Sequence, residues 1–150
     1  TLEDGVGRFS ARKIEAALRR LAQANKTDGI VEALRVLARA EHIRGRVEKA
    51  LELYVASLAT SPPEAKLQNS QLWVAIRGAS NSALSTLGDR GYAHLIDGIE
   101  ERAKDRSGHF SYLNNLASDR SQWLLSIVKR LREFDAGAGP ASNSADASGR

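Results

Sequence analysis

Large apolar residues recur at intervals of three and four along most of the chain, and this spacing limits the fold more than any other feature. Such spacing places the apolar side chains of a helix on one face. The alternation of apolar and polar residues that marks a half-buried strand occurs nowhere in the sequence. Only 5% of the residues are aromatic, and the helix formers Ala, Leu, Arg and Glu dominate. We therefore predict an all-α protein.

Caps and turn residues divide the first part of the pattern into helices. Ser10 is a suitable N-cap for an amphipathic helix over about residues 11–24. Thr27 or Asp28 can cap a second helix, which should end near Gly45. A third helix is expected to follow that turn directly.

The double proline at 62–63 ends the third helix, because proline lacks the amide donor and biases its predecessor away from the helical region. Beyond it the spacing predicts a helix over about 72–87, in one or two pieces, a turn at 88–91 and a short helix over about 92–106. The last and most regular helix should cover about 110–134. The total is five or six helices in one bundle of helical hairpins.

The chain of 150 residues is long enough for one domain with a single core. We assign a flexible N-terminal lead to residues 1–9 and the helical domain to 10–135. Residues 136–150 hold Gly, Ala, Ser, Asn and Pro without a large apolar side chain, which predicts a disordered tail. Because the chain starts at Thr1 and contains no methionine, we expect it to be part of a larger protein.

The sequence argues against several kinds of functional site. The absence of cysteine excludes disulfides, thiolate zinc sites and cysteine nucleophiles. His42, His94 and His109 fall in three separate elements without the spacing of metal ligands, so we expect no metal and no cofactor. No apolar run approaches the roughly 18 to 20 residues of a membrane span. The composition, rich in Ala and Arg, favours a bacterial source, and we favour a cytoplasmic location over a secreted one.

Residues 29–62 carry the one family resemblance. Small residues at Ala38 and Ala50 let two antiparallel helices approach closely, and Gly45 permits a tight turn between them. This segment resembles a single tetratricopeptide repeat, a helix-turn-helix unit of 34 residues. The positions that carry the resemblance are Leu34, Leu37, Ala38, Gly45, Ala50, Tyr54, Leu58 and Pro62.

The resemblance implies a concave groove that binds a partner peptide or helix, with no catalysis. Glu41 stands where that family usually has an aromatic residue, Ser57 stands where it prefers alanine, and no second repeat is visible. The segment also resembles the second helix of the microtubule-interacting-and-trafficking bundles. We favour a generic hairpin with small residues at the contact.

Positive charge is concentrated in the first third of the chain. Residues 1–50 hold 11 Lys/Arg against 7 Asp/Glu, within a net charge of +4. Spacings of four and three place one basic set on a single face if the second helix continues past Gly45, and two further arginines lie in the first helix. The candidate partner-binding residues are Arg35, Arg39, His42, Arg46, Lys49, Arg12 and Arg19. Such a stripe can bind phosphates, unless Glu32, Glu48 and Glu52 neutralise it.

The sequence thus predicts a non-enzymatic protein-protein interaction module. The alternative is a nucleic-acid or anionic-surface binder that uses the basic stripe. An enzyme ranks last, on a faint Arg-x6-His resemblance to helical RNases at Arg35 with His42 and at Arg102 with His109. The apolar stripe of the last helix suggests a homodimer if it is exposed. Trp73 and Trp123 are expected in the core, and either would mark a partner surface if exposed.

Overall fold

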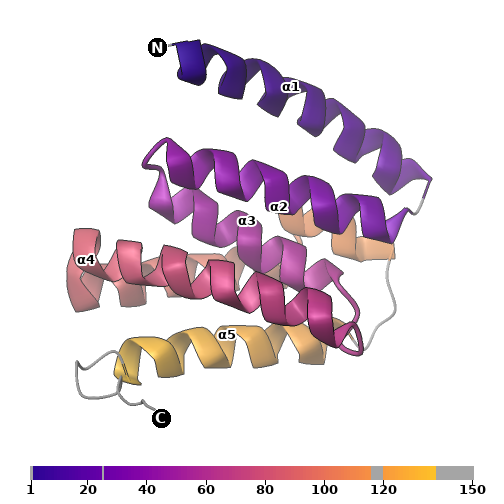
Figure 1. Cartoon of the computed structure of the whole chain (residues 1–150). Coiled ribbons are helices and arrows are strands. Elements are labelled where there is room, and N and C mark those ends of the chain that lie inside the picture. Colours follow the sequence, from indigo (N-terminus) through magenta and orange to yellow (C-terminus); the bar gives the residue numbers. More distant parts are fainter. Residues whose placement is uncertain (1, 25, 116–119, 138–150) are drawn as a thin grey trace.

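The computed structural model describes residues 2–24, 26–115 and 120–137, and side chains for 12–24, 26–113 and 120–134. These ranges contain helices and short connections but no strand, so the all-α prediction is confirmed (Figure 1). Their apolar side chains form one continuous core cluster. No helix in these ranges is long and apolar enough to cross a membrane. The elements are α1 (Leu2–Gln23), α2 (Thr27–Ile43), α3 (Val47–Thr60), α4 (Lys66–Asp105), the 3-10 helix η1 (Gly108–Asn115) and α5 (Arg120–Gly137).

Helix α3 is the centre of the bundle. Every residue from Ala50 to Ser61 is buried except Glu52, which is half-buried. The helix is enclosed because α2, α4, α5 and η1 all pack against it (Figure 1). A helix that is apolar all round is stable only in such a position. The remaining helices therefore each need only one apolar stripe, directed at α3 or at its neighbours.

Helices α2 and α3 form the antiparallel hairpin predicted for residues 29–62. Gly45 has a φ of +83° in the turn, a conformation that L side chains rarely adopt. Ala38 and Ala50 are fully buried, as expected of small residues at the contact. The hydroxyl of Ser57 donates to the carbonyl oxygen of Val31 at 2.8 Å and links the two helices further along.

Helix α4 bends back on itself at Gly88, whose φ of 78° and ψ of 174° are not helical. We call residues 66–87 its first arm and residues 89–105 its second arm. The hydroxyl of Tyr92 lies 3.1 Å from Oγ of Ser80, twelve residues away. A straight helix would separate these residues by about 18 Å, so the arms lie side by side. The turn predicted at 88–91 is thus a bend at one residue, and the first arm continues unbroken through its Ser- and Gly-rich middle.

The N-terminal boundary differs from the prediction. Helix α1 begins at Leu2, so it includes residues 2–9, and Ser10 lies inside the helix instead of capping it. No proline interrupts this stretch, and a glycine inside a helix costs only about 1 kcal/mol, which permits the extension. Helix α2 likewise begins without a side-chain cap, and neither Thr27 nor Asp28 is its N-cap.

The long last helix predicted over 110–134 is two elements, η1 and α5. Phe110 and Leu113 are both buried, and their spacing of three suits a 3-10 helix as well as an α-helix. Asn and Ser are frequent in this part of the sequence, and both residue types disfavour helix interiors because their side chains can compete for backbone hydrogen bonds. The apolar stripe of α5 packs inside the bundle, so it is not the exposed dimer face that the sequence suggested. Helix α5 ends at Gly137, and the predicted tail beyond it lies outside the described residues.

Candidate interaction surfaces

The predicted basic stripe does not form one row. Helix α2 ends at Ile43, before Gly45 turns the chain, so Arg46 and Lys49 belong to the start of α3. Arg35, Arg39 and His42 remain on α2, and the two earlier arginines lie on α1. The basic candidates are therefore distributed over three helices.

Two of these candidates form ion pairs with carboxylates of the same chain. The guanidinium of Arg35 donates twice to Glu32, at 3.0 and 2.5 Å. This hydrogen bonding lowers the pKa of Glu32 and raises the pKa of Arg35. Arg46 lies 3.6 Å from the buried carboxylate of Glu41, which Arg44 approaches at 4.0 Å. Only part of the positive charge is thus available to a ligand.

Four of the predicted candidate residues remain as exposed cations. Within the part of the chain that the structure describes, they have no ion pair, and they lie on α1, α2 and α3. They are Arg12, Arg19, Arg39 and Lys49. The sequence suggested that Glu32 and Glu52 would neutralise the basic residues. Glu32 does pair with Arg35, but Glu52 accepts from Arg102 of α4 at 2.9 Å and neutralises none of the candidates.

The histidines lie apart and have structural neighbours. His42 Nε2 lies 3.3 Å from Oγ of Ser82 on α4, and His109 Nε2 lies 3.1 Å from a carboxylate oxygen of Glu15, joining η1 to α1. His94 is exposed on the second arm of α4. In neither Arg-x6-His pair do the arginine and histidine side chains share a hydrogen-bond partner among the described residues. Among the described residues no three His, Asp or Glu side chains could hold a metal ion.

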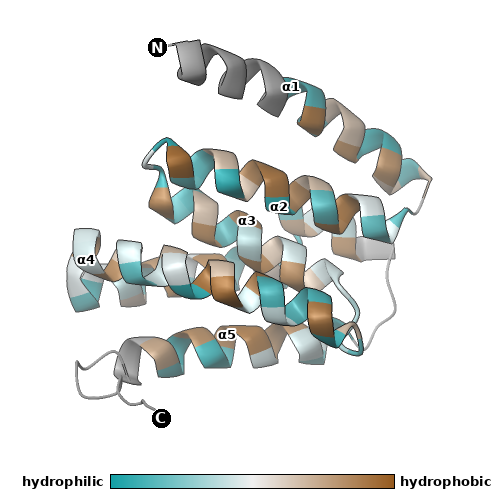
Figure 2. Ribbon diagram, viewed as in Figure 1, coloured by the Kyte–Doolittle hydropathy of each residue, from teal (hydrophilic) through white to brown (hydrophobic). Residues whose placement is uncertain are grey.

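A second surface, which the sequence analysis did not assign, lies along the first arm of α4 and the adjacent side of α5. Leu67 is 75% exposed and Val74 is 67% exposed. Being seven residues apart, they share one face of the helix. Figure 2 shows further hydrophobic residues along this arm. We call Leu67, Trp73, Val74, Arg77, Arg130 and Phe134 the α4–α5 surface.

Trp73 connects the two helices of this surface. Its ring is partly exposed, and the guanidinium carbon of Arg130 lies 3.9 Å from the ring centroid. This is a cation-π contact, worth about 0.5–1 kcal/mol at an exposed site. Trp73 also packs against the core, as predicted, and it is partly buried and not fully exposed. Trp123 is partly buried as well, and its indole donates to the carbonyl oxygens of Leu58 and Ser61 at 2.9 and 3.0 Å.

A shallow hollow lies beside Trp73. It has a volume of about 60 Å³ and is lined by Trp73, Ile76, Arg77, Ser80, Arg130, Leu131 and Phe134. Pockets for drug-sized ligands occupy about 300–1,000 Å³. This hollow therefore suits one inserted side chain and is too small for a whole small-molecule ligand.

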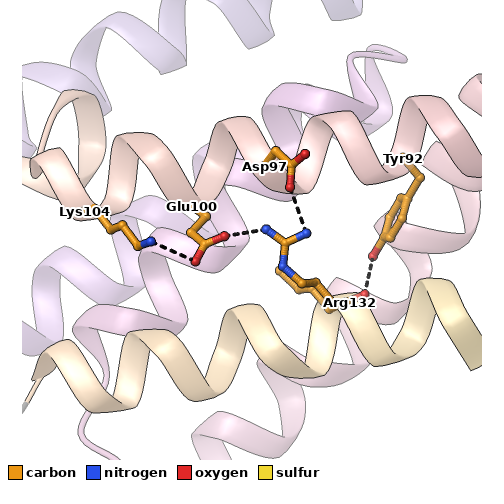
Figure 3. Close-up of polar contacts among 6 residues, drawn as sticks. Tyr92, Asp97, Glu100, Lys104 and Arg132 are labelled. Atoms are coloured by element: carbon orange, nitrogen blue, oxygen red, sulfur yellow. Dashed lines mark hydrogen bonds and ion pairs between the residues drawn. The ribbon is translucent and has the colours of Figure 1, made fainter.

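Within the two helix stretches that form most of this surface the charges have one sign, and the exposed Glu64 and Glu133 lie at their ends. Residues 65–88 and 120–132 contain no Asp or Glu, and the first acidic residue after them on α5 is Glu133. Arg132 is directed away from the surface toward the second arm, where it pairs with Asp97 at 2.8 Å and with Glu100 (Figure 3). The basic residues left exposed are Lys66, Arg77, Lys129 and Arg130.

Comparison of the chain with protein-family models, with curated proteins and with solved structures found no match. The tetratricopeptide resemblance of residues 29–62 therefore stays a prediction, although the hairpin itself is present.

Proposed function

We propose that this chain is a protein-protein interaction module and that the α4–α5 surface binds an apolar segment of a partner. The observation that carries the proposal is the exposure of Leu67 and Val74 on one face of a helix whose other face is buried. Burial of apolar surface is worth about 25 cal/mol per Å², so covering this face favours association. Nothing in the packing of α4 requires these two positions to be apolar. A binding role accounts for them.

Site-specific photocrosslinking in cells of the source organism tests the proposal. A benzophenone amino acid is placed at Leu67, at Val74 or, as control, at the exposed Glu101 of the second arm. We expect the same protein adduct from positions 67 and 74 and none from 101. Excess unlabelled wild-type chain should suppress the adduct, whereas the L67S/V74S variant should not.

Adducts of equal yield at all three positions, or none at 67 and 74, would contradict the proposal. An adduct with twice the mass of the chain would mean that the partner is a second copy of this chain. Thermal melting of each variant shows whether it is folded. Because both positions are exposed, their substitution is expected to change the free energy of unfolding by less than about 0.5 kcal/mol.

A second candidate function is binding to a nucleic acid or another anionic surface. It is supported by the exposure of Arg39 and Lys49 without an ion pair to any described residue. Binding of a fluorescent oligonucleotide should weaken with salt, and R39A/K49A should reduce the salt slope by about 2. Two controls are matched: E32Q/R35Q removes an ion pair at constant net charge, and R90A/K104A removes two charges from α4. Equal slopes for all variants would exclude this site.

A further inference from the structure

The α4–α5 surface has a charge pattern that restricts its partner. This inference rests on the proposed function and specifies the chemistry of the bound segment. Val74 lies one helical turn from Arg77 on α4, Arg130 lies over the ring of Trp73, and no acidic residue interrupts residues 65–88 or 120–132. A basic partner that lies over these two stretches would face Lys66, Arg77, Lys129 and Arg130, and like charges placed opposite one another at an interface strongly disfavour binding.

The arginines are also positioned for recognition. Arg130 lies over the ring of Trp73, which holds the guanidinium beside the hollow instead of leaving it free in solvent. Arg77 lines the same hollow. A cation that is already restrained loses less side-chain entropy when it binds a carboxylate. Both guanidinium groups therefore favour a carboxylate that enters from the partner.

The spacing of the apolar residues indicates the form of the partner. Leu67 and Val74 are two turns apart, or about 10.5 Å along the helix. A helix laid along this arm presents its own apolar residues at three- and four-residue intervals over the same length. An anionic membrane also attracts basic and apolar residues, but a bilayer surface does not place a side chain in a hollow of about 60 Å³. The hollow favours a peptide.

We propose that the α4–α5 surface binds an acidic amphipathic helix, whose apolar face covers Leu67, Val74 and Trp73 and whose carboxylates bind Arg77 and Arg130. Glu133 marks the C-terminal limit of the basic surface on α5. The acidic residues of the partner are therefore expected near Arg77 and Arg130 and not beyond Glu133.

Selection from a random library of 16-residue peptides displayed on phage tests this proposal with the whole chain as bait. We expect the enriched peptides to combine a negative net charge with apolar residues at helical spacing. As synthetic peptides they should lose affinity about tenfold or more for R77E/R130E, because that variant opposes like charges. R20E/R90E, which makes the same charge change at exposed positions of α1 and of the second arm, should bind like the wild type.

The outcomes separate this inference from the proposed function. Peptides that need Leu67 and Val74 but carry no acidic bias would overturn the inference and leave the function standing. Peptides unaffected by L67S/V74S would overturn both. Binding to phosphatidylcholine vesicles that contain phosphatidylserine, lost in L67S/V74S and without any enriched peptide, would assign the surface to a membrane and overturn the helix partner.

Discussion

Nη1 of Arg120 lies 2.8 Å from the carbonyl oxygen of Thr60 and donates to it, across the end of the central helix. In a continuing helix the amides of residues 62 and 63 would bond the carbonyls of Leu58 and Ala59. Both residues are prolines and have no amide hydrogen. The carbonyl of Leu58 accepts from the amide of Ser61 and from the indole of Trp123, and the guanidinium of Arg120 donates to the carbonyls of Ala59, Thr60 and Ser61. Two side chains of α5 thus complete the buried end of α3.

The first prediction concerns this end. Arg120→Met keeps the length of the side chain but leaves the carbonyl of Thr60 without its donor. Because Thr60 is buried, we expect a loss of about 1–3 kcal/mol in the free energy of unfolding, measured by urea denaturation. Arg90→Met, at an exposed position, is the control and should change it by less than about 0.5 kcal/mol. Equal effects would mean that water replaces the guanidinium.

The second prediction uses two glycines of α4. Gly88→Ala places a side chain in a backbone conformation that is essentially restricted to glycine, and we expect a loss of about 1–3 kcal/mol. No atom lies within 4 Å of the added carbon, so the cost is backbone strain and not a clash. Gly78→Ala also meets no atom but lies in regular helix, and it should stabilise by about 0.5–1 kcal/mol. Thermal melting should shift in opposite directions for the two variants.

The third prediction is a dependence on pH. Hydrogen bonding from Arg132, helped by Lys104 and opposed by burial, lowers the pKa of Glu100 below its ordinary value of 4.5 (Figure 3). A depressed pKa means that the contribution to stability is complete above 4.5 and is lost as the pH falls through the folded value.

Glu100→Gln should therefore be less stable than the wild type at pH 7, by about 0.5–1 kcal/mol for a partly exposed network. The difference should shrink below pH 4.5 in urea denaturation measured from pH 7 to pH 3. Glu101→Gln, at an exposed neighbour, should show no such trend. A difference for Glu100→Gln that stays constant across the range would assign its effect to packing.

The fourth prediction concerns the attachment of α1. Leu18 is fully buried, and His109 binds Glu15 one turn before it. Leu18→Ala should cost about 2–5 kcal/mol of packing energy. Because α1 lies at the edge of the bundle, we expect hydrogen exchange to accelerate first in α1 and only weakly in α3. Ala16→Gly, which leaves Leu18 in place, controls for helix propensity. Uniform acceleration in all helices would show that α1 unfolds only with the whole domain.

The features that sequence analysis predicted well depend on local chemistry. The α2–α3 hairpin follows from Gly45 and from the double proline, each of which limits the backbone whatever surrounds it. The bend at Gly88 was expected as a wider turn, since glycine permits a turn without specifying its length. The role of Arg120 could not be predicted from the sequence, because its partners are carbonyls about 60 residues away that no local pattern reveals.

The functional surfaces were less predictable for the same reason. The basic stripe required a helix that continued past Gly45, and the turn there divided it. The exposure of Leu67 and Val74 could not be predicted from the sequence, because it depends on which face of α4 the other helices cover. The long acid-free stretch around Trp73 was the available signal.

The completion of α3 by Arg120 and Trp123 also affects synthesis on the ribosome. The central helix is made early, but the donors for its last carbonyls are about 60 residues further along the chain. Until those residues leave the exit tunnel, the nascent α2–α3 hairpin must keep the end of α3 in contact with water. The N-terminal half of the protein therefore reaches its final packing only after the C-terminal half has been synthesised.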